Sequence, residues 1–231
     1  MTNTFAEASV GLQRLFGRPR DPSQSIRTRM GNAILGEVAV HRKGCKRMAV
    51  ARTPRSIWIE AGLHALAQGG PSAVRVEALA KTLGVTKGSF YWHLGDREAF
   101  LDEMLTTWEH DVTDNVIAVV ESEPGDARTK LARLFTIAQS YSRPEAMAIE
   151  LAIRDWARHD PAVAERLSRV DNRRMTFMRS LFAQFCSDEG DIEARCLLAF
   201  ALFIGNYFIT ADHGARTRSE VVEAALATLI T

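Results

Sequence analysis

Apolar residues recur every three to four positions along most of the chain beyond residue 53, and few stretches alternate apolar and polar residues with the period of a strand. Clusters of glycine, proline and acidic residues interrupt this pattern at 69–71, 122–125, 188–191 and 212–214. The pattern therefore predicts an all-α protein. We expect helices over residues 53–68 and 76–83, a very short helix ending at 94, and further helices over 96–121, 126–140, 144–158, 161–186, 192–210 and from 219 to near the end.

The eleven residues from Gly84 to Leu94 (GVTKGSFYWHL) form the most informative motif of the chain. Gly84 falls where the preceding helix must end, at a position that often requires a positive φ, and Thr86 can cap the next helix through its hydroxyl. Phe90 and Leu94 are four residues apart and are expected to pack inward, with Val85 at the turn. Two helices joined by a tight turn predict a helix-turn-helix whose second helix enters a DNA groove.

The second helix of this motif carries side chains of the kinds that contact phosphates and base edges. Gly88 is a poor helix former, so its presence suggests a close approach of the backbone to a partner helix or to a DNA phosphate. Trp92 has two interpretations, because an indole so near the core is either packed or presented to DNA. The side chains expected to face outward are Thr86, Lys87, Ser89, Tyr91, Trp92 and His93.

The segment from Thr53 to Leu105 resembles the DNA-binding domain of the TetR family of bacterial transcriptional regulators. The resemblance implies an N-terminal three-helix, helix-turn-helix DNA-binding domain, followed by a larger helical domain for ligand binding and dimerisation. The first helix is expected to support the three-helix core through an apolar stripe. The matching residues are Ile57, Ala61, Leu66, Gly70, Leu79, Ala80, the whole motif from Gly84 to Leu94, and Asp96 to Leu101; the stripe comprises Ile57, Ala61, Leu63, Leu66 and Ala67.

Two arginines extend the predicted DNA contacts beyond the short helix. Family members commonly carry Thr or Ser just before the second helix, whereas this chain has Arg75, which we expect to reach a phosphate or a guanine. Arg97 matches a basic position that in the family often meets phosphate, and an ion pair with Glu98 is the alternative. The predicted DNA-binding residues are Arg75, Val76, Thr86, Lys87, Ser89, Tyr91, Trp92, His93 and Arg97.

Charge is distributed unevenly along the 231 residues, although the formal net charge is only +1. Residues 1–50 carry nine basic and three acidic residues, residues 51–100 six and four, and residues 101–231 fourteen and twenty-one. We therefore expect a basic extension (1–50), a DNA-binding domain (51–100) and a helical regulatory and dimerisation domain (101–231). The extension is either a disordered basic arm or the product of a misassigned start, with Met48 as the true first residue.

The resemblance implies that the regulatory domain encloses a cavity for a small molecule. Aromatic and methionine residues at helical spacing form its candidate lining, although plain core packing explains each of them as well. Arg154 invites a role in binding a carboxylate ligand, but a helix-surface ion pair with Glu150 explains it better. The candidate ligand-binding residues are Trp108, Phe135, Tyr141, Met147, Trp156, Met175, Phe182 and Tyr207, together with Phe177 and Met178.

Homodimerisation is expected through the segments Ile192–Thr210 and Ser219–Ile230. The first of these is apolar almost all round, so it must be buried on several sides, against its own domain and against a partner. One short recognition helix covers only a few base pairs, and two half-sites are needed for useful specificity.

Other function classes find little support in the sequence. Glycine-rich phosphate loops, paired His-Glu metal spacing and nucleophile elbows do not occur, so we expect no catalytic residue, metal or cofactor. The three cysteines lack zinc spacing and favour a reduced cytoplasmic setting; Cys186 and Cys196 are either buried apolar residues or a redox pair. No apolar run approaches the length of about 18 residues that predicts a membrane span.

The sequence thus predicts a ligand-responsive, DNA-binding transcriptional regulator that is not an enzyme. The resemblance implies a repressor that binds a palindromic operator as a homodimer and is released by a small-molecule effector. The alternative is an effector-independent architectural DNA-binding protein, which the long acidic helical half argues against. The expected route from ligand to DNA is the helix over residues 96–121, since it joins both halves.

Overall fold

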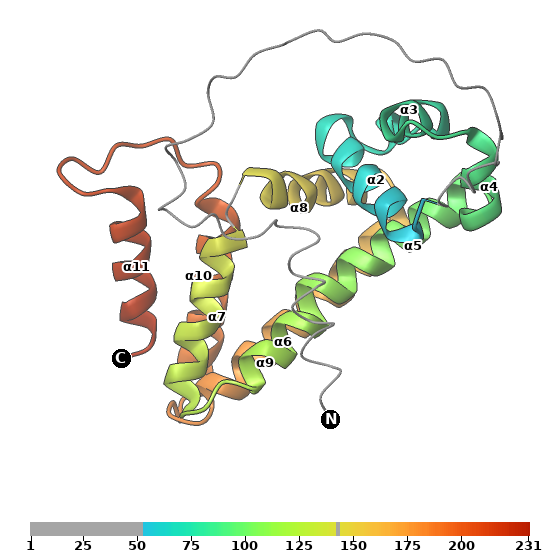
Figure 1. The fold of residues 1–231 in the computed structure, drawn as a ribbon. Coiled ribbons are helices and arrows are strands. Elements are labelled where there is room, and N and C mark those ends of the chain that lie inside the picture. The colour runs from blue at the N-terminus through green and yellow to red at the C-terminus, as the bar shows by residue number, and fades with distance from the viewer. Residues whose placement is uncertain (1–52, 142–143) are drawn as a thin grey trace, which may run out of the picture.

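The computed structural model describes residues 53–231 apart from 142 and 143. The extension over 1–50, with its alternative start at Met48, lies outside the described residues. Within them every regular element is helical, which confirms the predicted all-α class (Figure 1). The elements are α2 (Arg55–Gly69), η2 (Pro71–Ala73), α3 (Val76–Leu83), α4 (Lys87–Leu94), α5 (Arg97–Glu109), η3 (His110–Asp114), α6 (Asn115–Glu121), α7 (Ala127–Tyr141), α8 (Pro144–Ala157), α9 (Pro161–Phe182), α10 (Glu189–Gly205) and α11 (Arg218–Leu229).

Helix α2 turns most of the predicted stripe to the core, since Leu63 and Leu66 are buried and Ala61 and Ala67 pack against the buried residues. Ile57 is 39% exposed, whereas Trp58 and Ile59 are buried, so the prediction was wrong for Ile57. The cause is the close approach of α5 at Gly62, where an added Cβ would lie 2.6 Å from both Met104 Sδ and Phe100 Cζ. The buried stripe runs through this glycine and consists of Trp58, Ile59, Gly62, Leu63 and Leu66.

The predicted turn between α3 and α4 is present. Gly84 has φ 66° and ψ 30°, in the left-handed region that glycine adopts without a steric cost. The amide of Val85 donates to the carbonyl of Ala80 at 3.0 Å and closes the end of α3. Thr86 occupies the position before α4, but its side chain makes no capping hydrogen bond there, so the predicted role of its hydroxyl was wrong.

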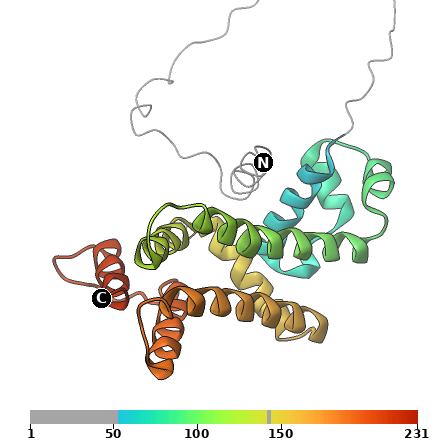
Figure 2. The same ribbon diagram turned by 90° about the horizontal axis from the view of Figure 1, so that it is seen from below.

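The helix predicted over 96–121 is one continuous rod made of α5, η3 and α6. Asp96 caps it, since its Oδ1 accepts from the amide of Ala99 at 2.8 Å. The middle segment η3 is a π-helical turn, a departure from α-helical geometry that often accompanies functional sites. Figure 2 shows this rod and α9 as two long helices with α8 crossing between them.

The apolar core consists of two clusters. The first joins α2 to α5 with Ile149 and Ile153 of α8 and with Val163 and Val170 of α9, so the packing of the helix-turn-helix half continues into α8 and α9. The second lies among α6, α7, the end of α9, α10 and α11. The C-terminal helices therefore contact the helix-turn-helix half through α8 as well as through the continuous helix of α5, η3 and α6.

The last two helices begin and end at other residues than predicted. Helix α11 is capped by Thr217, which forms a reciprocal capping box with Glu220, and not by Ser219. Helix α10 begins at Glu189 and ends at Gly205, five residues before the expected end. The guanidinium of Arg218 binds the carbonyls of Asn206 (2.9 Å) and Ala211 (3.2 Å), which stabilises the non-helical segment that follows.

Candidate nucleic-acid interface and ligand cavity

Helix α4 is anchored through one side chain at its centre. Phe90 is fully buried and meets Trp58 and Phe100 edge to face, with ring centroids 5.3 and 5.1 Å away. Leu94, one turn later, is buried beside it, as the i, i+4 spacing predicted. Edge-to-face aromatic contacts have a preferred geometry, so this cluster fixes which face of α4 points outward.

The outward face of α4 carries most of the predicted DNA contacts. Lys87 and Tyr91 are exposed, and Ser89 and His93 are half-buried at its sides. Trp92 is 72% exposed, so its indole is not part of the core. These side chains combine a positive charge, two aromatic rings, a hydroxyl and an imidazole on one short helix, a combination suited to phosphates and base edges.

Lys87 forms an ion pair with Glu77 that the sequence did not predict. Its ammonium group lies 2.8 Å from Glu77 Oε1 on α3, and both side chains are largely exposed. The hydrogen bond from Lys87 lowers the pKa of the Glu77 carboxyl. The two residues are ten positions apart and on different helices, so helical spacing gave no indication of this pair.

Gly88 has no steric role within the folded chain. A Cβ at this position would meet only Thr86 Oγ1, at an ordinary 3.8 Å. Close approach to a partner helix, one of the two explanations offered for this glycine, is therefore not what requires it. The backbone at Gly88 is exposed beside Lys87 and Ser89.

The remaining predicted DNA contacts differ in what they present to solvent. Arg75 is exposed at the start of α3, whereas Val76 is buried in the core and offers only its backbone. Arg97 donates from Nε to the carbonyl of Val74 at 2.9 Å and from Nη2 to the carbonyl of Pro71. Arg97 thus holds the turn before α3 to the start of α5, and the structure shows no ion pair between it and Glu98.

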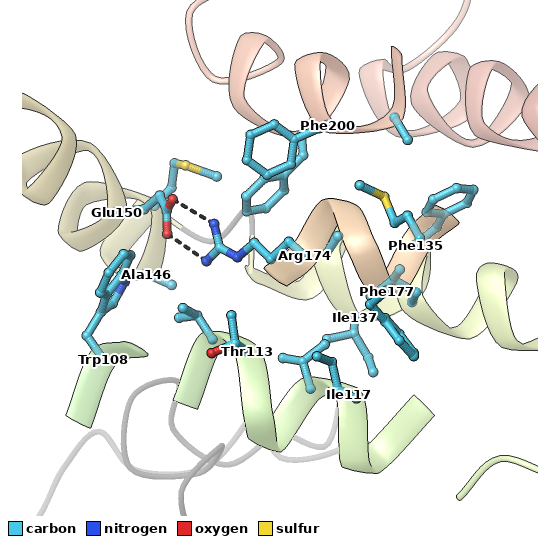
Figure 3. Close-up of a pocket in the computed structure, with 18 of the residues that line it drawn as sticks. Trp108, Thr113, Ile117, Phe135, Ile137, Ala146, Glu150, Arg174, Phe177 and Phe200 are labelled. Atoms are coloured by element: carbon cyan, nitrogen blue, oxygen red, sulfur yellow. Dashed lines mark hydrogen bonds and ion pairs between the residues drawn. The ribbon is translucent and has the colours of Figure 1, made fainter. Parts of the chain in front are cut away.

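A cavity of about 100 Å³ lies among the rod α5–α6 and helices α7 to α10 (Figure 3). Its wall is largely apolar, with Ile117, Phe135, Phe177 and Phe200 among the lining side chains. The π-helical turn contributes Val112 and Thr113, and the Thr113 hydroxyl donates to the carbonyl of Glu109. Such a space suits a small, mainly apolar molecule.

The cavity includes some of the predicted lining residues and leaves out others. Trp108, Phe135, Met147, Phe177 and Met178 line it. The side chain of Tyr141 lies outside what the structure describes. Four predicted residues lie elsewhere: Trp156 in the first core with its indole donating to Asp160, Met175 and Phe182 in the second core, and Tyr207 on the surface against Phe208.

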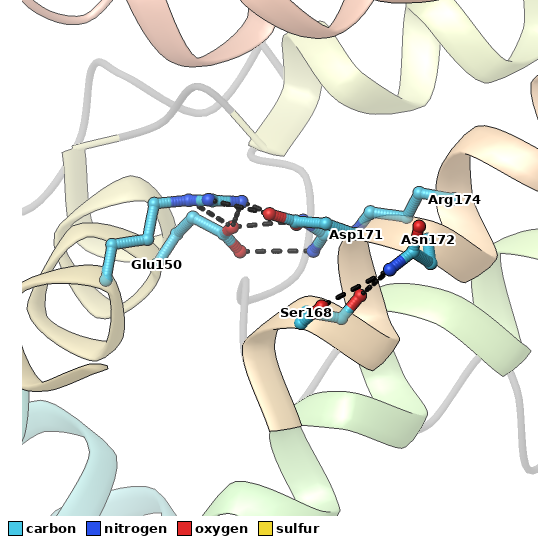
Figure 4. Close-up of polar contacts among 6 residues, drawn as sticks. Glu150, Ser168, Asp171, Asn172 and Arg174 are labelled. Atoms are coloured by element: carbon cyan, nitrogen blue, oxygen red, sulfur yellow. Dashed lines mark hydrogen bonds and ion pairs between the residues drawn. The ribbon is translucent and has the colours of Figure 1, made fainter. Parts of the chain in front are cut away.

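Glu150 and Arg174 line the cavity and belong to a charged cluster that Arg154 and Asp171 complete (Figure 4). Glu150 of α8 is almost fully buried and pairs with Arg174 of α9 through two hydrogen bonds, at 3.0 and 3.1 Å. Arg154 donates to Glu150 at 2.8 Å and forms a two-pronged pair with Asp171, at 2.7 and 2.9 Å. The expected pair of Glu150 with Arg154 is present, but it is buried and cross-linked to α9, so the prediction of a helix-surface pair was wrong.

The cluster keeps its charges despite burial. Burial by itself raises the pKa of Glu150, but the charges and hydrogen bonds of Arg174 and Arg154 outweigh it, and the pKa of this carboxyl is lowered. The pKa of Arg154 is raised, since hydrogen bonds and attraction from Asp171 and Glu150 overcome its own desolvation. Sequence reasoning missed Glu150 and Arg174 as lining residues, because a charged residue on a helix is expected to face solvent.

Exposed apolar side chains gather on α10 and just after it. Leu197 and Leu198 are more than half exposed, and so is Phe208, while Ile209 is nearly so. The opposite side of α10 packs inward, with Cys196 and Ala199 buried and Phe200 on the cavity. Burial raises the pKa of the Cys196 thiol to about 11, which fits a buried apolar residue better than a reactive one.

Comparison with known proteins agrees with this architecture. Residues 59–104 match the model of the bacterial regulatory proteins of the tetR family. No curated protein sequence matches the chain. A TetR transcriptional regulator from Legionella pneumophila has a similar structure, with a TM-score of 0.65 and 12% identity, covering 80% of this chain and 100% of the other. A transcriptional regulator from Rhodococcus sp. Rha1 is 19% identical with a TM-score of 0.59, covering 77% and 94%.

One further property concerns membranes. Among the helices that the structure describes, none has both the length and the hydropathy required to span a bilayer.

Proposed function

For this chain, a DNA-binding transcriptional regulator of the TetR family, we propose the function of a cytoplasmic repressor that binds a palindromic operator as a homodimer. A small-molecule effector that enters the cavity among α5 to α10 releases it from DNA. The exposed face of α4, held by the buried Phe90, is the observation that carries this proposal. Repression, as opposed to activation, follows from the family.

Each part of the predicted DNA-binding set has its own proposed role. Lys87 exchanges Glu77 for a phosphate, and Gly88 allows the sugar-phosphate backbone to approach α4 closely. Tyr91, Trp92 and His93 read base edges or pack on sugars, with Thr86 and Ser89 as hydroxyl donors. Arg75 reaches the edge of the groove, and Val76 offers its backbone amide at the start of α3. Arg97 holds the turn before α3 through the carbonyl of Val74, and it can contact a phosphate only after this hydrogen bond breaks.

The proposed dimer uses the apolar surface around α10 and α11. Leucine and phenylalanine side chains that are more than half exposed are unfavourable in water, and a group of them on one segment is typical of a protein interface. A second copy of this chain is the partner that operator binding requires, because each copy supplies a single recognition helix. The interface residues lie within the segments Ile192–Thr210 and Ser219–Ile230.

Effector binding is proposed to act through differential affinity. A molecule in the cavity shifts the dimer toward the form in which it binds better, and only to the extent of that preference. The continuous rod connects the cavity to the DNA-binding half, since Trp108 and Thr113 line the cavity while Phe100 packs on Phe90. The alternative, an architectural DNA-binding protein without effector, gives no role to a cavity of this composition.

Footprinting of the purified protein on the DNA that flanks its gene, at near-physiological salt, tests the proposal. A protected palindrome is the expected result, and a diffuse protection that modest salt abolishes would instead indicate non-specific binding. Lys87→Ala should lower affinity for all sequences and reduce the salt slope by about one. Lys130→Ala on α7, which removes the same charge from the regulatory half, is the matched control and should leave binding unchanged.

A further inference from the structure

The charged cluster in the cavity wall restricts the charge of the molecule that the cavity accepts. Glu150 and Asp171 contribute two negative charges, and Arg154 and Arg174 contribute two positive charges, joined by ion pairs of 2.7 to 3.6 Å. These charges balance, so a ligand that brought a charge of its own would find no free counter-charge in the cluster and would still lose its hydration. The cluster therefore favours a neutral ligand.

Hydrogen bonds to Glu150 are divided unevenly between its two carboxylate oxygens. Oε1 accepts from Arg154 Nε at 3.0 Å, from Arg154 Nη2 at 2.8 Å and from Arg174 Nη1 at 3.0 Å. From the part of the chain that the structure describes, Oε2 accepts only from Arg174 Nη2, at 3.1 Å. A carboxylate offers about four acceptor positions over its two oxygens, so Oε2 has room for one more donor.

Glu150 acts in this site as an acceptor only. Its lowered pKa keeps the carboxyl ionised at neutral pH, and an ionised carboxylate has no proton to donate. The open acceptor position at Oε2 can therefore be filled by a donor that the ligand supplies.

The rest of the wall is apolar and sets the size of the ligand. Figure 3 shows Glu150 on one side of the cavity and the rings of Phe135 and Phe177 on the other, with Arg174 between them. The volume is about 100 Å³, which is less than the roughly 150 Å³ of an apolar cavity that holds benzene, so a ligand of one ring requires the wall to adjust. Met147 and Met178, which also line the space, adapt readily to the shape of a ligand.

We propose that the cavity binds a neutral alcohol or phenol of about one ring in size. The apolar part packs against Phe135 and Phe177, and the hydroxyl donates to Oε2 of Glu150. This inference rests on the proposed function, since it takes the cavity as the effector site.

Four small molecules that share a benzene ring and differ in the charge and hydrogen-bonding capacity of one substituent test the ligand class: benzyl alcohol, toluene, benzoate and benzylammonium. Their dissociation constants are measured by ligand-observed NMR on the intact protein without DNA. Benzyl alcohol should bind about five- to tenfold more tightly than toluene, because it gains one hydrogen bond to a charged acceptor. The two ions should bind at least about tenfold more weakly than the alcohol, because each leaves a buried charge unpaired.

Two variants of the cluster make the test sharper. Glu150→Gln leaves two arginines facing Asp171 alone, and this excess positive charge should make benzoate the tightest-binding probe. Arg174→Met leaves an excess negative charge and should instead favour benzylammonium. If one variant fails to fold, as thermal unfolding would reveal, the other still tests whether the charge balance of the cluster selects the ligand.

The outcomes separate this inference from the proposed function. Equal binding of toluene and benzyl alcohol, tighter binding of benzoate to the unmodified protein, or no binding of any probe would overturn the ligand class. Operator affinity is then measured with and without benzyl alcohol. Binding in the expected order with unchanged operator affinity would support the ligand class and contradict the effector role of the cavity.

Discussion

The half of this protein formed by α2 to α5 and the half formed by α6 to α11, for which we propose DNA binding and regulation, are packed in opposite ways. In the first, α2 and α5 approach so closely that Gly62 has no room for a methyl group, and Phe90 is enclosed by two other rings. In the second, a space of about 100 Å³ remains among apolar side chains, with a charged cluster in its wall. Close packing fixes the orientation of the exposed face of α4, whereas unfilled space leaves room for a small molecule.

The largest effect should follow from breaking the charged cluster. Glu150→Ala leaves Arg154 and Arg174 without their shared partner and should lower the free energy of unfolding by about 3 to 5 kcal/mol, measured by urea denaturation. The pKa of Glu150 is lower in the folded state, so its contribution is present above the ordinary value of about 4.3 and is lost as the pH falls through the folded value. The difference between the two proteins should therefore shrink in acid; a difference that grows in acid would contradict the assignment.

A smaller loss should follow from adding one carbon to the tightly packed half. Gly62→Ala places a methyl group against Met104 and Phe100 and should cost about 1 to 3 kcal/mol, because a filled core resists insertion. Gly205→Ala is the matched control, since nothing lies within 4 Å of its added Cβ. Denaturation curves in which Gly62→Ala is as stable as the control would show that α2 and α5 can separate at little cost.

The regulatory half should tolerate a larger addition. Ala146→Met on α8 extends a flexible side chain into the cavity and should change the free energy of unfolding by less than about 1 kcal/mol. The same variant should lose most of its affinity for benzyl alcohol, since the space is filled. Retained binding at unchanged affinity would place the ligand elsewhere.

The smallest effect should come from the ion pair at the DNA-binding surface. Glu77→Gln frees Lys87 for phosphate and should raise operator affinity about two- to threefold, the modest change expected for an exposed pair. Glu165→Gln, which removes an exposed glutamate paired with Arg169 on α9, is the control for overall charge. Fluorescence anisotropy with labelled operator DNA measures both, and a fall in affinity with Glu77→Gln would assign this glutamate a direct role on DNA.

Local sequence determined the helix-turn-helix almost completely. Gly84 ends α3 because only glycine adopts its left-handed backbone freely, and Phe90 and Leu94 share one face because four residues make about one helical turn. The caps by Asp96 and Asp160 are likewise local, since each is a contact between residues two or three positions apart. These features depend on neighbours in the chain, so the residues and their spacing suffice.

Tertiary structure alone decided which neighbours the helices meet. Helical periodicity places Ile57 and Trp58 100° apart on α2, but only the approach of α5 at Gly62 selects the face with Trp58. Glu150 and Arg174 are charged, and nothing in the residues around them indicates that α8 and α9 bring them together against a cavity. Trp156, Met175, Phe182 and Tyr207 have the residue types of a ligand site and lie outside it, because a cavity forms where distant helices fail to meet.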